Sequence, residues 1–330
     1  MQKKAFFFKN IWSYKKKAVP LQPISKTNKV FLAQLVEQLT LNQWVQGSSP
    51  WEDTKDTQRT PKGVSFFTQQ TLSQVMQAMI FAAGLGTRLK PLTDTLPKAL
   101  VPLAGKTLLE WQIEKLKAAG ITDIVVNVHH FPDMIIDYLH KHNNFGCNIQ
   151  VSDERDMLLE TGGGLRKAMR LLSNKAIDEG ILVCNVDILS NIDIPTLLKA
   201  YNPDEMGVVV VYPRDTQRYL LFDETNRLCG WTNIATGEVK PTPTPFLKEG
   251  ELDPEIKKLA FSGMQVLSPR IFDCMDAVVQ AKGDKFSLID LYLSIAKKEI
   301  LKAFIPENYR MMDVGKIAQL SEAEAFAQSL

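Results

Sequence analysis

The sequence has little of what several classes of protein require. Its four cysteines are far apart and form no C-x-x-C pair, which argues against a zinc site or a disulfide framework and is typical of a reducing cytoplasm. No apolar run approaches the length of a membrane-spanning helix, and we find no internal repeat. We therefore expect a globular cytoplasmic protein with no membrane partner.

The chain also lacks a strong net charge, which is formally +2. The first 75 residues contain 11 of the 39 Lys and Arg but only 4 of the 37 Asp and Glu, so residues 76–330 have a net charge of −5. A basic surface of the kind that binds nucleic acid is therefore not indicated in this larger part, and we expect no nucleic-acid partner.

Residues 1–75 show no sustained hydrophobic period, and lysines interrupt their first apolar cluster before it could form a signal-peptide core. We expect a disordered N-terminal extension or a mis-annotated one, because the run from Leu32 to Pro50 resembles a conceptual translation of a transfer-RNA gene. Genuine translation would then begin at Met76 or Met79. The predicted domain comprises residues 76–330.

The chemistry-bearing pattern begins in the stretch from Met79 to Pro102. Ile80 to Ala83 form a short apolar run that ends at Gly84-Leu85-Gly86-Thr87-Arg88, which predicts a buried strand followed by a turn of small residues. Glycines let an anion approach backbone N–H groups, and Arg88 and Lys98 add two positive charges. The pattern indicates a phosphate-binding turn.

After this turn the hydrophobic pattern alternates between helix and strand. Helices are expected at residues 107–119, at about 132–141 and after Gly162-Gly163-Gly164, and strands at 123–128, near 148–152 and at 181–186. This alternation predicts an α/β fold with a mostly parallel, Rossmann-like sheet and helices on both faces. Ligands bind at the carboxyl ends of the strands in such sheets.

The second half of the chain is more mixed. Apolar runs at residues 208–211, 219–222 and 228–231 predict strands of a small antiparallel lobe over the sheet. A further strand is expected at Phe261–Leu267, then helices near 269–280 and 288–299, and the residues at 303–305 and 309–312 complete the apolar pattern.

The glycine turn and the segment after it resemble the sugar-1-phosphate nucleotidyltransferases, whose signature is A-A-G-x-G-T-R-L followed by P-K-A. The resemblance covers residues 79–330, without the C-terminal β-helix that many relatives carry. It implies that Arg88 and Lys98 are catalytic and that Lys98 lies where the sugar phosphate attacks. It also implies that the turn binds the nucleoside triphosphate through Ala82, Ala83, Gly84, Gly86, Thr87 and Arg88.

The same resemblance implies a magnesium site. Asp187 ends Asn185-Val186-Asp187, where the family has N-G-D, and Asp313 lies in Met312-Asp313-Val314-Gly315, where the family has W-x-D-V/I-G-T. Both acids offer the oxygen ligands that Mg²⁺ prefers. The valine that replaces the family's glycine could narrow the cleft beside the metal.

Two further stretches complete the implied site. The segment Leu159-Glu160-Thr161-Gly162-Gly163-Gly164 corresponds to the loop under the nucleoside, so Gly162 and Gly163 are expected to contact the nucleotide. Its form is closest to the N-acetylmuramate-1-phosphate uridylyltransferase branch. The segment Phe261-Ser262-Gly263 resembles the family's sugar-contacting strand. The sugar phosphate is therefore expected to bind to Lys98, Asn185, Ser262 and Gly263.

The predicted reaction is the Mg²⁺-dependent transfer of a nucleotidyl group from a nucleoside triphosphate to a sugar 1-phosphate, with release of pyrophosphate. Uridylyl transfer is slightly favoured, and guanylyl transfer to mannose 1-phosphate is the close alternative. A dinucleotide-dependent oxidoreductase is disfavoured because the third glycine of G-x-G-x-x-G is missing. A catalytically silent sugar-nucleotide regulator would be expected to lose Lys98 or the acids. The oligomeric state is left open.

Overall fold

The computed structural model of the protein describes residues 76–172, 179–241, 247–248 and 251–330. The extension predicted at residues 1–75 lies outside this part of the chain. Among the described residues, no helix is both long and apolar enough to cross a membrane.

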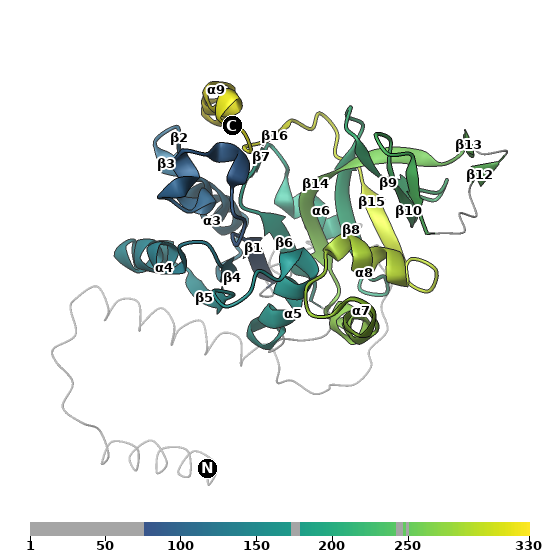
Figure 1. Ribbon diagram of the computed structural model, residues 1–330, viewed down its shortest axis with the longest axis horizontal. Helices are drawn as coiled ribbons and strands as arrows, with labels where there is room; N and C mark the ends of the chain where they lie inside the picture. The colour runs from purple at the N-terminus through teal and green to yellow at the C-terminus, as the bar shows by residue number, and fades with distance from the viewer. Residues whose placement is uncertain (1–75, 173–178, 242–246, 249–250) are drawn as a thin grey trace, which may run out of the picture. The chain divides into compact units, whose positions relative to one another are not determined.

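A ten-stranded sheet forms the centre of the domain (Figure 1). Its strands follow the order β11-β10-β9-β14-β6-β1-β4-β5, and β8 pairs with both β14 and β15. The predicted parallel part is confirmed, because each neighbouring pair among four strands runs parallel. These strands are β1 (Gln77–Phe81), β4 (Asp123–Val128), β5 (Asn148–Asp153) and β6 (Ile181–Asn185).

The antiparallel part predicted for the second half is also present, and it continues the central sheet. The long strand β14 (Lys257–Leu267) makes this connection, because it pairs antiparallel with β9 near its start and with β6 near its end. The other strands of this part are β8 (Gly207–Tyr212), β9 (Arg218–Phe222), β10 (Leu228–Asn233), β11 (Glu238–Lys240) and β15 (Leu301–Phe304).

Three short strand pairs stand apart from the large sheet. They are β2 (Pro102–Leu103) with β3 (Lys106–Thr107), β7 (Ile188–Ser190) with β16 (Met311–Asp313), and β12 (Leu247–Lys248) with β13 (Glu251–Leu252). The β7–β16 pair matters most for function, because it joins two segments that are far apart in the sequence.

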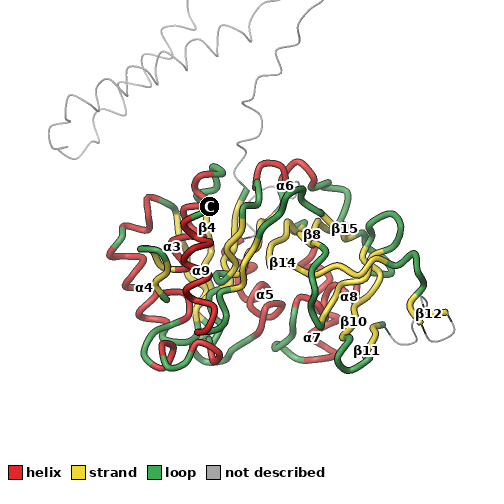
Figure 2. Tube along the Cα trace, turned by 90° about the horizontal axis from the view of Figure 1, so that it is seen from above, coloured by secondary structure: helices red, strands yellow, loops and turns green. Residues whose placement is uncertain are grey.

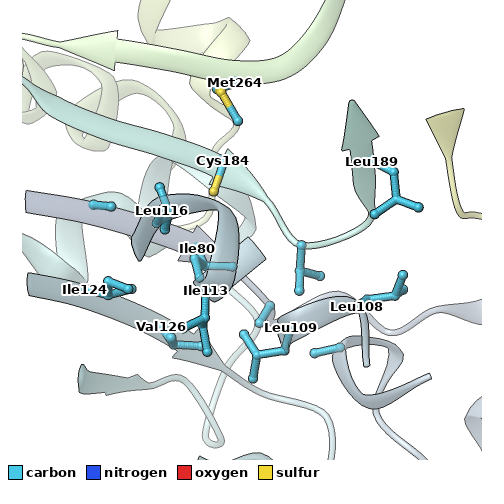
Figure 3. Packing of buried hydrophobic residues seen from close by; sticks show 14 of the residues in the cluster. Ile80, Leu108, Leu109, Ile113, Leu116, Ile124, Val126, Cys184, Leu189 and Met264 are labelled. Atoms are coloured by element: carbon cyan, nitrogen blue, oxygen red, sulfur yellow. The ribbon is translucent and has the colours of Figure 1, made fainter. Parts of the chain in front are cut away.

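Helices cover both faces of the sheet. Side chains of a strand point alternately to its two sides, so each strand contributes residues to the cores on both faces. In β1, Ala78 and Ile80 enter one hydrophobic core, and Met79 and Phe81 enter the other. Figure 3 shows the first core, where Ile80 packs near Ile113. The first core includes side chains of α3 (Leu108–Ala118), α4 (Pro132–Lys141), α6 (Ile194–Ala200) and α9 (Leu320–Gln328). The second includes α5 (Glu160–Leu172), α7 (Met275–Lys282) and α8 (Leu288–Ile295).

The trace in Figure 2 shows α3, α4 and α9 together at the left of the view, and α5, α7 and α8 from its centre to its right. Short 3₁₀ turns complete the domain: η2 (Thr87–Leu89), η3 (Leu92–Asp94), η4 (Lys98–Leu100), η5 (Asn143–Gly146), η6 (Pro269–Cys274) and η7 (Ile317–Gln319).

Local signals explain the element ends that the sequence predicts well. The Thr107 side chain accepts a hydrogen bond from the Glu110 N–H and so caps α3, and Gly120 has a φ of 82° just after the helix. The observed α4 has the predicted bounds. By contrast, the predicted helix near residues 269–280 divides into η6 and α7, and α6, α9 and β7 were not predicted.

The first strand begins and ends earlier in the chain than predicted. It was expected at Ile80–Ala83, but β1 spans Gln77–Phe81. The Ala82 N–H donates to the Asn127 side chain instead of continuing the strand ladder. Ala82 and Ala83 therefore belong to the turn, and the domain's first strand already begins before Met79.

Candidate active site

The turn after β1 is shaped by one of its two glycines. Gly86 has a φ of 63°, and a Cβ there would lie 2.8 Å from Thr93 Cγ2 and 3.1 Å from Lys98 Cβ. The Thr93 hydroxyl donates to the Gly86 carbonyl over 2.9 Å. A Cβ at Gly84 would have no heavy atom within 4 Å. Gly86 is thus required by the turn itself, whereas Gly84 leaves open space.

A cavity of about 370 Å³ adjoins this turn at the carboxyl ends of β1, β4 and β6. This is the edge of the sheet where the alternating pattern predicts a ligand. Of the predicted site residues, Ala83, Gly84, Lys98, Asn185 and Asp187 line the cavity.

The β7–β16 pair brings the two predicted metal ligands together. Asp313 lies opposite Ile188 in this pair, and the Val314 N–H donates to the Asp187 carbonyl over 2.9 Å. The Lys98 ammonium forms an ion pair with the Asp187 carboxylate. On the other side, Arg88 Nη2 lies 4.0 Å from Asp313 Oδ2. The two cations and the two acids of the sequence prediction therefore form one cluster.

The electrostatics of this cluster suit a divalent cation. Burial raises the pKa of Asp313, the nearby Asp187 raises it further, and Lys98, Arg88 and Arg214 act in the opposite direction. Asp313 Oδ1 is buried and has no hydrogen-bond partner in the described part of the chain. A metal cation at this oxygen would favour the ionised form of Asp313. The donor set of two carboxylates fits Mg²⁺, which commonly takes its remaining ligands from water and substrate phosphates.

A buried chain of hydrogen bonds, which was not predicted from the sequence, lies next to the cavity. The Ala82 N–H donates to Asn127 Oδ1 over 2.7 Å, and Asn127 Nδ2 donates to Glu154 Oε1 over 2.7 Å. Glu154 is fully buried, and burial raises the pKa of its carboxyl group. Its other oxygen accepts from the Leu159 N–H over 3.3 Å. The chain ties the glycine turn to the segment before α5, and Asn127 was visible in the sequence as the polar residue inside an apolar strand.

Helix α3 holds the strand that follows Asp187, which sequence reasoning also missed. Gln112 Nε2 donates to the Ile188 carbonyl, and Lys115 Nζ donates to the Ser190 carbonyl, each over 2.5 Å. Burial lowers the pKa of Lys115 to about 8. Gln112 and Lys115 are polar residues beside the apolar residues of α3. A polar residue at such a position indicates a buried polar contact.

The glycine triplet packs closely against another part of the chain. The N–H groups of Gly162 and Gly163 both donate to the Phe286 carbonyl, over 2.9 and 3.1 Å. A Cβ on Gly163 would lie 2.1 Å from the Asp284 carbonyl oxygen. The predicted contact of these glycines with a nucleotide stays a prediction, and the close approach in the structure is to protein. Glu160 and Thr161, just before the triplet, line the cavity instead.

The segment predicted to contact the sugar lies within β14. Ser262 is fully buried at the place where the register of β14 against β8 shifts, and its contact with a sugar stays a prediction. Gly263 has a φ of 77°, and a Cβ there would lie 2.9 Å from Asn185 Nδ2. Gly263 therefore makes room for Asn185, which does line the cavity.

Comparison with known proteins now decides the family. The family model described as nucleotidyl transferase matches residues 77–329. The chain belongs to this family of sugar-1-phosphate nucleotidyltransferases. The N-acetylmuramate alpha-1-phosphate uridylyltransferase of Caulobacter vibrioides is 32% identical over 255 residues, which are 75% of this chain and 95% of that protein.

One further relative and one solved structure extend the comparison. The mannose-1-phosphate guanyltransferase of Gibberella zeae is 36% identical over 154 residues, which are 42% of each chain. A UDP-glucose pyrophosphorylase solved with UDP-glucose is 17% identical, with a TM-score of 0.59, and the match covers 78% of this chain and all of that one. At this identity the solved structure supports the nucleotidyltransferase fold alone.

Proposed function

We propose that this nucleotidyltransferase uses Mg²⁺ and UTP to convert a sugar 1-phosphate into a UDP-sugar and pyrophosphate, with N-acetylmuramate 1-phosphate as the first candidate acceptor. The observation that carries the proposal is the cluster of Lys98, Arg88, Asp187 and Asp313 beside the cavity. The uridylyltransferase of Caulobacter vibrioides, matched over nearly its whole length, favours this base and sugar.

The chain's own residues would act mainly by binding and electrostatics. An oxygen of the sugar phosphate attacks the α-phosphorus of the nucleotide, the bond to the pyrophosphate group breaks, and pyrophosphate leaves. The attacking phosphate is already an anion, so no side-chain nucleophile is required. Lys98 is only 8% exposed, and a positive charge in such a water-poor place strongly stabilises negative charge that gathers during attack.

Arg88 would act earlier. Its side chain is 59% exposed, so it can reach the triphosphate as the nucleotide binds. Asp187 and Asp313 would hold the Mg²⁺ ion. When bound, the ion neutralises part of the triphosphate charge. The buried oxygen of Asp313 without a hydrogen-bond partner is the feature of the cluster that fits this role.

Guanylyl transfer to mannose 1-phosphate is the second candidate. The observation that favours it is the 36% identity to the Gibberella zeae guanyltransferase, which exceeds the 32% identity to the uridylyltransferase but covers a smaller share of the chain. A silent regulator is disfavoured because both cations and both acids remain in one cluster.

A panel of four nucleoside triphosphates against several sugar 1-phosphates, scored by pyrophosphate release with and without Mg²⁺, tests these proposals. We expect UTP with N-acetylmuramate 1-phosphate to give the highest kcat/KM, and chelation of Mg²⁺ to stop release. A preference for GTP with mannose 1-phosphate would establish the second candidate. No release with any pair would refute the proposed activity.

A further inference from the structure

Glu160 combines an unfavourable backbone conformation with an exposed carboxylate in the cavity. It is the first residue of α5 and has a φ of 62°, which glycine adopts far more readily than glutamate. Three glycines follow after Thr161, at positions 162–164, yet this position carries a long charged side chain. Backbone strain of this kind persists where the surroundings enforce it, and it clusters at functional sites.

The surroundings of Glu160 do enforce the conformation. The N–H groups of Gly162 and Gly163 are held by the Phe286 carbonyl, and the Thr161 hydroxyl oxygen accepts from the Leu288 N–H over 2.9 Å. The start of α5 is therefore anchored to the segment before α8. This anchoring places Glu160 in the lining of the 370 Å³ cavity.

The carboxylate of Glu160 has no hydrogen bond or ion pair to any other described residue. The neighbouring polar side chains are already engaged. Both atoms of the Asn127 amide are bonded, to Ala82 and Glu154, and Ser287 forms a capping box with Asp290. Glu160 is thus the free acceptor at its part of the cavity, and an ionised carboxylate can only accept hydrogen bonds.

The rest of the lining indicates which part of a nucleotide lies next to Glu160. The phosphates of the nucleotide are expected near Lys98 and Gly84, because the Glu160 carboxylate would repel them. Leu158, two residues before Glu160, and Phe81 supply apolar surface in the same cavity. Apolar side chains of this kind contact the flat face of a nucleobase, which leaves the base edge for a polar group.

We propose that Glu160 selects the base by accepting a hydrogen bond from its ring N–H. Uracil has such a donor at N3 and guanine at N1. Cytosine N3 and adenine N1 carry lone pairs that a carboxylate repels, so these bases offer it only the neighbouring exocyclic amino group. This inference rests on the proposed function but holds for either candidate base. It makes Glu160 a specificity-determining residue that the glycine-rich motif beside it does not reveal.

The test compares kcat/KM for UTP, dUTP, GTP, CTP and ATP in the unmodified protein and in the Glu160→Gln and Glu160→Gly variants. The unmodified protein should use its preferred ring N–H base at least tenfold better than CTP or ATP, and that ratio should fall roughly tenfold or more in both variants. The glycine variant should also unfold at a higher temperature, because glycine relieves the strain at this φ. Glu224→Gln, the same chemical change at an exposed turn residue, should leave the ratio unaltered.

Two outcomes would overturn the inference. One is an unchanged base ratio in both Glu160 variants. The other is a change confined to the ratio of UTP to dUTP, because this would place Glu160 next to the ribose. Binding of UMP and CMP by calorimetry gives a readout without turnover. If no pyrophosphate is released by any protein, the proposed function fails, while a UMP preference that disappears in Glu160→Gln still supports the base contact.

Discussion

Gly84 and Gly163 belong to two glycine-rich stretches that border the same cavity, yet an added methyl group would meet different surroundings at each. At Gly84 it would find no heavy atom within 4 Å, and at Gly163 it would lie 2.1 Å from the Asp284 carbonyl oxygen. The first stretch leaves room for a ligand, and the second leaves room for another part of the chain. A glycine-rich motif therefore shows that something comes close without showing what it is.

The largest expected effect concerns the acids opposite the first stretch. Asp187→Asn and Asp313→Asn should each reduce turnover by about 1000-fold and raise the Mg²⁺ concentration needed for half-maximal rate, because each would remove one of the two proposed anionic metal ligands. Thermal unfolding should still show a folded protein. An exposed control, Asp204→Asn, should behave like the unmodified protein. Unchanged Mg²⁺ dependence in either site variant would remove that residue from the site.

The two cations of the first stretch should separate in their effects. Lys98→Ala should lower turnover roughly 100- to 1000-fold with little change in nucleotide affinity, because a charged contact made in the transition state contributes about 3–4 kcal/mol. Arg88→Ala should weaken nucleotide binding as well as turnover. Steady-state rates and calorimetry check both, with Lys258→Ala as an exposed control. Lost affinity with surviving turnover in Lys98→Ala would contradict the assigned role.

Gly163→Ala directly tests the second stretch. The new methyl group would overlap backbone atoms of the 284 region, so we expect destabilisation by about 3 kcal/mol, seen as a fall in Tm of roughly 6–12 °C. Gly237→Ala offers a comparison, because a Cβ there would have no heavy atom within 4 Å but would stand at a φ of 71°. A Gly163→Ala protein with unaltered Tm would show that the packing does not require glycine.

Gly84→Ala is the opposite case. Stability should change by less than about 0.5 kcal/mol, because the methyl group meets open space, whereas nucleotide affinity should fall about tenfold because we propose that the same space receives the nucleotide. Urea unfolding and nucleotide titration on one preparation measure the two quantities. Equal loss of stability at Gly84 and Gly163 would break the comparison between the stretches.

The smallest effect is expected from shortening the chain ahead of the first stretch. A protein that begins at Met76 should match the full chain in Tm and activity, because β1 begins at Gln77. One that begins at Met79 loses Gln77 and Ala78, which pair with Asp123 and Ile124 of β4, and should be less stable. A loss of solubility or activity on starting at Met76 would show that residues 1–75 contribute to the domain.

Much of the fold could be predicted because its signals are local. The β-branched run at residues 123–128 and the helix bounds at Pro132–Lys141 were predicted as observed. Elements with weak local signals were missed. The last helix, α9, is rich in alanine and acidic residues, and β7 has three residues, too few for a period to be recognised.

The position of residues at the cavity could be predicted where local motifs carry them, but not where contacts cross the chain. Ala83, Gly84, Lys98, Asn185 and Asp187 were predicted site residues and line the cavity. Ser262 was assigned to the sugar from its strand motif, but burial depends on how β14 bends against β8, which the motif does not encode. Glu154 was missed because a lone acid after a strand is usually a surface residue.

By itself, the sequence determined the alternating strands and helices, the turn of small residues after β1 and the motif that carries its charged residues, because each of these depends on neighbours along the chain. The tertiary structure alone decided that β7 and β16 pair and bring Asp313 beside Asp187, and that the glycine triplet packs on Phe286 and Asp284. Contacts of this second kind depend on how distant segments pack in space, and packing is a property of the whole folded domain rather than of any one stretch.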